Sequence, residues 1–232
     1  MSERKPARRS VAAVVSLFVL VAGGTGCVTV NETSENMLIP SPEPAPHASV
    51  LLRGRVSPET MELDPVIVVS GAAAPAAGRA STYLLRGFSA AGAVMFEVGL
   101  DAGELGSLPG REAQHFMAAA PVGPGGAMEL ERVELHGADG RLLERHARID
   151  ASAMVDALRE GTALAVTSLG GDRIRLEWDP ETFPLVQVRD PGRGYVLAVG
   201  RNGVIELSTD AEAIEVAVSE GVRSTAYRYA LR

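Results

Sequence analysis

The chain has 232 residues, of which 46% are hydrophobic and only 4% are aromatic. This is enough apolar material for one large core or two small ones, and too much for a chain that is disordered throughout. The net charge is −7, and the arginines alternate with acidic residues. Nucleic-acid binding needs clustered positive charge, so the composition argues against a nucleic-acid partner.

The first residues have the composition of an export signal. Four basic residues among the first nine precede the run 11–22, which is apolar except for Ser16. A membrane-spanning helix needs about 20 apolar residues, and Gly23 and Gly24 break this run well before that length. We therefore expect residues 1–26 to be a signal peptide that is removed, and not a spanning anchor.

The only cysteine of the chain, Cys27, directly follows this segment. Gly24-Thr25-Gly26-Cys27 resembles the lipobox of bacterial lipoproteins, although that family usually has an aliphatic residue at the place of Gly24. The resemblance implies cleavage before Cys27 and acylation of its thiol and amine. It also implies the outer membrane, since Val28 stands where an inner-membrane lipoprotein has Asp. Ordinary cleavage that releases a soluble product is the alternative.

The segment 27–48 is expected to be a flexible tether between the lipid on Cys27 and a folded body. Proline occupies every second position from Pro40 to Pro46. Proline lacks the backbone N–H and has a fixed φ, so regular helix or sheet pairing is not expected here.

From residue 49 onward, short runs of Val, Leu and Ile recur about every ten residues between Gly, Pro, Asp and Asn. This spacing predicts an all-β fold of one or two immunoglobulin-like or fibronectin-like sandwiches. We expect one sandwich over 49–150 and another over 151–232, either separate or fused into one body. The expected strands are 50–56, 62–70, 81–87, 93–100, 113–119, 128–136, 141–149, 162–168, 173–178, 184–189, 195–200, 204–208, 213–219 and 223–231.

One short helix is expected over 151–160, capped by Asp150, as the connection between the two halves. A turn at Asp139-Gly140 places Leu135 opposite Leu143, which keeps apolar partners on one face.

Two further turns predict strand pairing in the second half. A loop over 169–171 places Val166 opposite Ile174. Asn202-Gly203 is the strongest hairpin signal in the chain, because both residues tolerate the positive φ of a tight turn.

Strict alternation over 173–179 places Ile174, Leu176 and Trp178 on one face, so Trp178 is expected in a core. This strand and its successor loosely resemble the tryptophan-bearing region of fibronectin type III domains, which implies a fibronectin-like second half. The alternative is that Trp178 lies at a sandwich end and stacks on a ligand.

The sequence motifs predict no catalytic residue, no cofactor and no metal site. His136 and His146 share a face of one hairpin but are four residues apart, about 13 Å, which is too far for two ligands of one zinc ion. Ser89 follows Gly87 but lacks the second glycine of a nucleophile elbow and lies between strands. We therefore do not expect an enzyme.

Acidic residues in loops leave one alternative open. Asp179, Glu181 and Asp190 lie beside Pro or Gly, where carboxylates form turns by accepting backbone hydrogen bonds. The alternative function is a small-ligand or calcium-binding sandwich that uses these loop carboxylates.

The candidate interface residues are apolar or aromatic residues of two late strands: Tyr195, Leu197, Val199, Tyr227 and Tyr229. The first three are expected to pack on the first half of the chain, or else to form a patch for an envelope protein partner. The predicted function is therefore a lipid-anchored cell-envelope protein that acts as a binding or structural module.

Overall fold

The computed structural model describes residues 36–38, 49–69, 71, 82–100, 105–107, 113–123, 125–161 and 163–231. The predicted signal peptide, Cys27 and the prolines of the tether lie outside these residues. No helix within the described ranges is both long and apolar enough to cross a bilayer. The predicted all-β sandwich fold is confirmed, with helices limited to short connecting elements.

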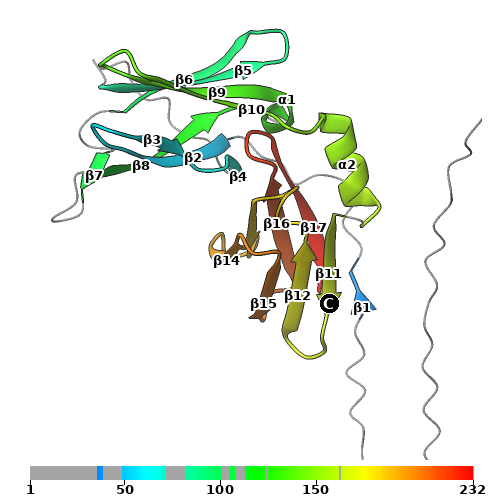
Figure 1. Cartoon of the computed structure of the whole chain (residues 1–232). Coiled ribbons are helices and arrows are strands. Elements are labelled where there is room, and N and C mark those ends of the chain that lie inside the picture. The colour runs from blue at the N-terminus through cyan, green and yellow to red at the C-terminus, as the bar shows by residue number, and fades with distance from the viewer. Residues whose placement is uncertain are drawn as a thin grey trace, which may run out of the picture. The chain divides into compact units, whose positions relative to one another are not determined.

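The first half is a sandwich of two antiparallel sheets (Figure 1). Its elements are β2 (Ser49–Val56), β3 (Met61–Leu63), β4 (Ile67–Val69), β5 (Tyr83–Ser89), β6 (Val94–Leu100), β7 (Leu105–Ser107), β8 (Gln114–Pro121), α1 (Gly126–Glu129), β9 (Leu130–Gly137) and β10 (Leu142–His146). One sheet has the order β10-β9-β5-β6 and the other β3-β2-β8-β7, with β4 also paired to β2. The strands β3 and β10 therefore lie at sheet edges.

The second half is a further sandwich of antiparallel sheets. Its elements are β1 (Asn36–Met37), α2 (Ala151–Arg159), β11 (Leu164–Ser168), β12 (Arg173–Trp178), β13 (Leu185–Arg189), β14 (Val196–Gly200), β15 (Val204–Ser208), β16 (Ala213–Ser219) and β17 (Ser224–Ala230). The sheets are β1-β11-β12-β15 and β14-β13-β16-β17. Of the seven described strands after α2, the first, second and fifth share one sheet and the others form the second.

The strand β1 corrects the prediction of a wholly flexible tether. Asn36 pairs with Ser168 and Met37 with Thr167, and the Leu38 N–H donates to the Val166 carbonyl over 2.7 Å. These residues precede the prolines, so they keep the backbone N–H groups that sheet pairing requires. They cover an edge of β11 that would otherwise be unpaired within its sheet.

The helix and the first predicted turn are confirmed. The helix α2 occupies the predicted range, although the Asp150 side chain makes no capping hydrogen bond, and Met154 lies in the core of the second half. In the β9–β10 hairpin Leu135 lies opposite Leu143, as predicted.

The predicted pairing of Val166 with Ile174 is wrong, because the β11–β12 loop begins one residue later. The Leu169 N–H donates to the Arg173 carbonyl over 3.0 Å, which leaves residues 170–172 as the loop. Val166 consequently pairs with Leu176. The shift of the partner by two residues keeps the same apolar face, so the core pattern survives.

The Asn202-Gly203 turn is not a hairpin between paired strands. It connects β14 and β15, which belong to different sheets. Gly203 has a φ of 84°, and its carbonyl accepts the Trp178 N–H over 2.9 Å, so the turn carries the chain from one sheet to the other. The strand β15 pairs with β12 instead of with β14, so pairing between strands distant in sequence prevails over the local turn signal at Asn202-Gly203.

Two hydrophobic cores lie within one compact unit. The core of the second half contains Trp178, which is 7% exposed and donates its Nε1–H to the Phe183 carbonyl over 2.9 Å. The predicted core position of Trp178 is therefore confirmed. The core of the first half also takes in residues of the second half: Leu185, Ala217, Val222 and Ala226.

Candidate functional site

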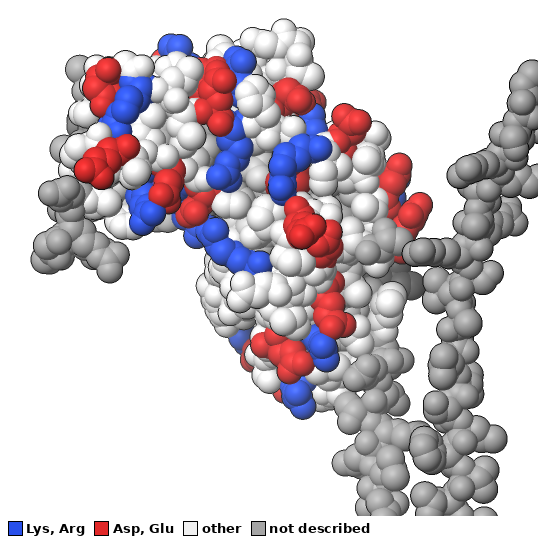
Figure 2. Space-filling view, viewed as in Figure 1, with Lys and Arg blue, Asp and Glu red and all other residues white. Residues whose placement is uncertain are grey.

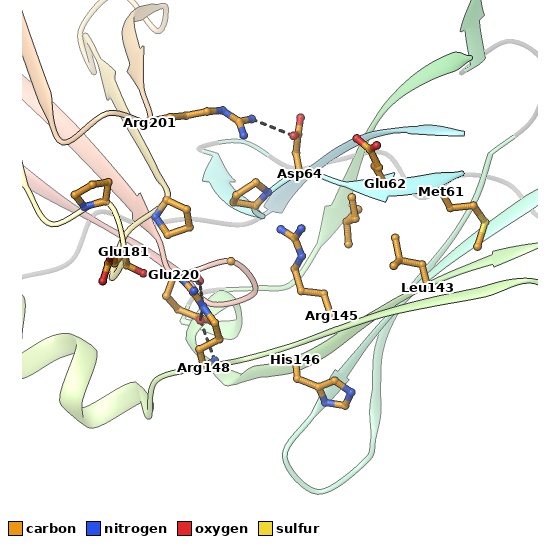
Figure 3. A pocket seen from close by; sticks show the side chains of 15 residues that line it. Met61, Glu62, Asp64, Leu143, Arg145, His146, Arg148, Glu181, Arg201 and Glu220 are labelled. Carbon is orange, nitrogen blue, oxygen red and sulfur yellow. Dashed lines mark hydrogen bonds and ion pairs between the residues drawn. The ribbon is translucent and has the colours of Figure 1, made fainter. Parts of the chain in front are cut away.

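A cleft of about 900 Å³ lies where the two halves meet, lined by residues of both (Figure 3). The first half contributes β3 with the following loop and the end of β10: Met61, Glu62, Leu63, Asp64, Pro65, Leu143, Arg145, His146 and Arg148. The second half contributes the turn after β12, the residue after β14 and the β16–β17 hairpin: Pro180, Glu181, Pro184, Arg201, Glu220 and Gly221.

Arg145 reaches from β10 into this cleft (Figure 3). On β10 it lies opposite Val133, a residue of the first core, so its side chain leaves from the inward face of the hairpin and is half-buried. A Cβ built on Gly221 would lie 3.9 Å from the Arg145 Cδ, an ordinary van der Waals distance, so the arginine stem runs beside this glycine.

The guanidinium of Arg145 makes no hydrogen bond or ion pair with any residue that the structure describes. Burial lowers its pKa from the ordinary value, because charge is harder to hold away from water. Asp64 and Glu220 oppose this shift, whereas Arg148 and Arg201 add to it. An arginine remains charged even so, and the cleft therefore contains a charged guanidinium whose N–H donors have no hydrogen-bonded partner among the described residues.

Arg201 and Asp64 form an ion pair between the two halves. Arg201 Nη2 lies 3.0 Å from Asp64 Oδ1. Both side chains are exposed to solvent. One arginine and one carboxylate of the cleft are therefore already paired with each other.

Glu220, at the tip of the β16–β17 hairpin, is fully buried and satisfied. Its carboxylate accepts backbone N–H groups from Arg148 at 2.9 Å, Val222 at 3.2 Å and Arg223 at 2.8 Å. The Arg148 side chain donates in turn to the carbonyls of Glu220 and Glu181. These bonds hold the hairpin tip against the end of β10 and fix one wall of the cleft.

The five predicted interface residues lie elsewhere. Tyr227 and Tyr229 are 5% and 2% exposed inside the second core, so they present no surface to a partner. Tyr195 and Val199 are both 47% exposed, and Leu197 packs against the second core. The expectation that these three residues pack on the first half is wrong, because Leu197 contacts the second core and the other two are largely exposed.

The predicted loop carboxylates have turn-forming roles. Asp179 accepts the Glu181 N–H over 3.0 Å. Asp190 accepts the N–H groups of Gly192 at 2.8 Å and Arg193 at 3.0 Å. Among the described residues, no group of three or more His, Cys, Asp or Glu side chains is arranged to hold a metal ion.

The two histidines of the β9–β10 hairpin have the predicted register, with His136 opposite Leu142 and His146 opposite Arg132. The surroundings of His136 differ from a solvated face: its Nε2 lies 2.7 Å from Glu134, which is buried and also pairs with Arg132 at 3.0 Å. The pair with His136 belongs to the outer face of the sheet and not to the cleft.

Ser89 ends β5, and its Oγ accepts the Ala93 N–H over 3.3 Å in the β5–β6 turn. Figure 2 shows acidic and basic side chains interspersed over the visible face. A binding site is therefore argued from individual side chains and not from a charged patch.

Sequence reasoning did not single out Arg145, although one signal was present. The predicted hairpin register places Arg145 opposite Val133, on the face that also carries Leu135 and Leu143. An arginine on an otherwise apolar face indicates a charge that needs a partner or a ligand.

No family model and no curated protein matches this chain.

Proposed function

We propose that the protein is a lipid-anchored binding module of the bacterial cell envelope. The anchor is inferred from the basic and apolar leader that ends in Gly24-Thr25-Gly26-Cys27. The binding role rests on one observation, the cleft between the sandwiches with the unpaired, half-buried Arg145. A purely structural spacer gains nothing from such a residue, because withdrawing an unpaired charge from water costs free energy.

The pairing of β1 supports a statement about which part of the body a lipid on Cys27 would keep near the membrane. Asn36 lies nine positions after Cys27, and a fully extended chain spans at most about 3.3–3.6 Å per residue, or about 30 Å here. A lipid on Cys27 therefore holds the second sandwich, to which β1 pairs, within about 30 Å of the bilayer surface. A free tether as far as Ser49 would allow more than twice that reach.

The anchor is tested by Cys27→Ser. We expect the variant to lose lipid labelling and, where it is still cleaved, to move from the membrane fraction to the soluble fraction. Thr29→Ser changes the same segment without touching the thiol and should stay in the membrane fraction. A cleaved Cys27→Ser protein that remains with the membranes contradicts the proposal.

The second candidate function is a small-ligand or calcium-binding sandwich. The volume of the cleft favours the small-ligand form. For the calcium form, metal bound to the folded state would raise the melting temperature. We expect no rise on adding calcium, since Asp179 and Asp190 accept turn hydrogen bonds; a clear rise would support calcium binding instead.

A further inference from the structure

We propose that the cleft binds a carboxylate carried on an apolar body, with the Arg145 guanidinium as its ion-pair partner. This inference rests on the proposed binding role and adds the chemical class of the ligand. It does not depend on the lipid anchor, because the cleft belongs entirely to the folded body.

The first step is that Arg145 differs from the other two arginines of the cleft. Arg201 is paired with Asp64, and Arg148 is held by the carbonyls of Glu220 and Glu181. Arg145 has no such partner among the described residues, although Asp64 and Glu220 line the same cleft. The carboxylates of the lining outnumber its arginines four to three, so what Arg145 offers a ligand is a guanidinium with unused N–H donors and not a surplus of positive charge.

The second step is the position of this charge. Arg145 leaves from the inward face of β10 and runs beside Gly221, so its stem is enclosed and its guanidinium is held in the cleft. A partly buried guanidinium presents a planar fork of N–H donors, which a carboxylate or phosphate can accept in two parallel hydrogen bonds. Binding such an anion offsets the cost of keeping the charge partly away from water.

The third step selects a carboxylate over a phosphate. Glu62, Asp64 and Glu181 also line the cleft, so a doubly charged phosphate would meet repulsion from several sides. A carboxylate carries one negative charge, so it meets less of this repulsion than a doubly charged phosphate does. It can still accept both N–H groups of the Arg145 fork.

The fourth step concerns the rest of the ligand. Apolar side chains line part of the same cleft, namely Met61, Leu63 and Leu143 together with the prolines at 65, 180 and 184. No Phe, Tyr or Trp side chain is present among the described residues that line the cleft, so the platform on which sugar rings commonly stack is missing there. Aliphatic groups next to the carboxylate fit these walls best.

The test uses the full chain, purified from membranes in mild detergent, and a pair of probes that differ only in charge. N-acetyl-leucyl-leucine carries the carboxylate, and its C-terminal amide does not. Titration calorimetry should detect binding of the acid and not of the amide. Arg145→Gln should weaken binding of the acid about tenfold or more, as expected for loss of a charge-assisted, two-pronged hydrogen bond.

Matched variants separate the site from general charge effects. Arg86→Gln removes an arginine that pairs with Glu97 on the outer part of the first sandwich, and it should leave affinity for the acid unchanged. Arg145→Lys keeps the charge but loses the fork, so its affinity should lie between those of the native chain and Arg145→Gln. Denaturant unfolding curves of the native chain and Arg145→Gln are the folding control. If the two curves are equal, the weaker binding of the acid is not caused by unfolding of the variant.

The proposal is overturned by equal binding of acid and amide, by no binding of the acid, or by native affinity in Arg145→Gln. Tighter binding of inorganic phosphate than of the acid also overturns the assigned ligand class. These outcomes are read from purified protein in solution. They are thus distinct from failure of the anchor, which is read from lipid labelling and fractionation.

Discussion

The two faces of the sheet β14-β13-β16-β17 meet different surroundings and are built differently. The face toward the second core carries large side chains: Val186, Val188, Ile214, Val216, Val218, Tyr227 and Tyr229. The face toward the first half carries one large side chain, Leu185, and otherwise small apolar and buried polar residues: Ala217, Ala226, Gln187, Glu215 and Ser224. We call the first the bulky face and the second the polar face. The bulky face excludes water by filling the second core, and the polar face forms a close junction with the first half.

Hydrogen bonds across the junction show what the second face achieves. The Ser224 hydroxyl accepts the Val68 N–H over 3.1 Å and donates to the Val218 carbonyl over 2.8 Å. The Val66 N–H donates to the Gly221 carbonyl over 3.0 Å. Directional bonds of this kind fix one sandwich against the other, and with them the walls of the cleft. The bulky face therefore stabilises the fold of the second sandwich, whereas the polar face determines how the two sandwiches are held against each other.

Truncating Trp178 should cost the most. Trp178→Ala removes a large buried ring from the core on the bulky side and leaves a cavity, so we expect a loss of about 3–5 kcal/mol in the free energy of unfolding. Denaturant titration measures this loss, and Trp178→Phe should lose less because most of the apolar volume remains. Tryptophan emission of the native chain should be blue-shifted and resist acrylamide. A loss below about 1 kcal/mol would contradict the core role.

Changing Glu220 should cost less, because it tests the junction. Glu220→Gln puts an amide where a buried carboxylate accepts three backbone N–H groups. We expect a loss of about 1–3 kcal/mol in unfolding free energy, from weakened or unmatched buried hydrogen bonds. Glu181→Gln is the control, since this exposed residue of the same cleft should lose almost nothing. Equal losses of unfolding free energy in the two variants would contradict the prediction that Glu220 stabilises the junction.

The buried hydroxyl of Tyr229, on the bulky face, should make the free energy of unfolding depend on pH in the alkaline range. Burial raises the pKa of the Tyr229 hydroxyl well above its ordinary value of about 10, so the folded state keeps it neutral while the unfolded state ionises. Stability from this group is complete below pH 10 and falls as the pH rises further, by at most about 1.4 kcal/mol at pH 11. Tyr229→Phe should flatten this fall in unfolding free energy between pH 9 and 11; an unchanged slope would contradict the assignment.

Local signals in the sequence were sufficient for most strands and for α2. Alternation and glycine turns place β12, β15 and β16 at their observed bounds. The expected strand 62–70 is instead two strands, β3 and β4, because Pro65 between them lacks the N–H for continuous pairing. The short strands β1 and β7 were not predicted, since a few residues carry no periodic pattern and pair only because β11 and β8 present free edges.

The candidate site could be predicted only in part. The hairpin register already placed Arg145 on an apolar face. Whether that charge is paired depends on Asp64 and Glu220, which lie far from it in sequence and reach the cleft through the junction. Similarly, Tyr227 and Tyr229 alternate like surface residues of an edge strand, but their face is covered by the opposite sheet.

The smallest effect is expected for the ion pair of Arg201 and Asp64, which also bridges the two halves. Both side chains are exposed, so water and salt screen the attraction, and holding two long side chains together costs entropy. Asp64 also lies within the field of Arg145, which still attracts it when Arg201 is removed. A double-mutant cycle of Arg201→Gln and Asp64→Asn should therefore give a coupling of about 0–1 kcal/mol in unfolding free energy, falling further at high salt. A coupling above about 2 kcal/mol would mean that the exposed pair stabilises the junction as much as the buried bonds of Glu220 do. Buried and exposed contacts of the junction would then stabilise it equally, and only the two faces of the sheet would still differ in what they contribute to the free energy of unfolding.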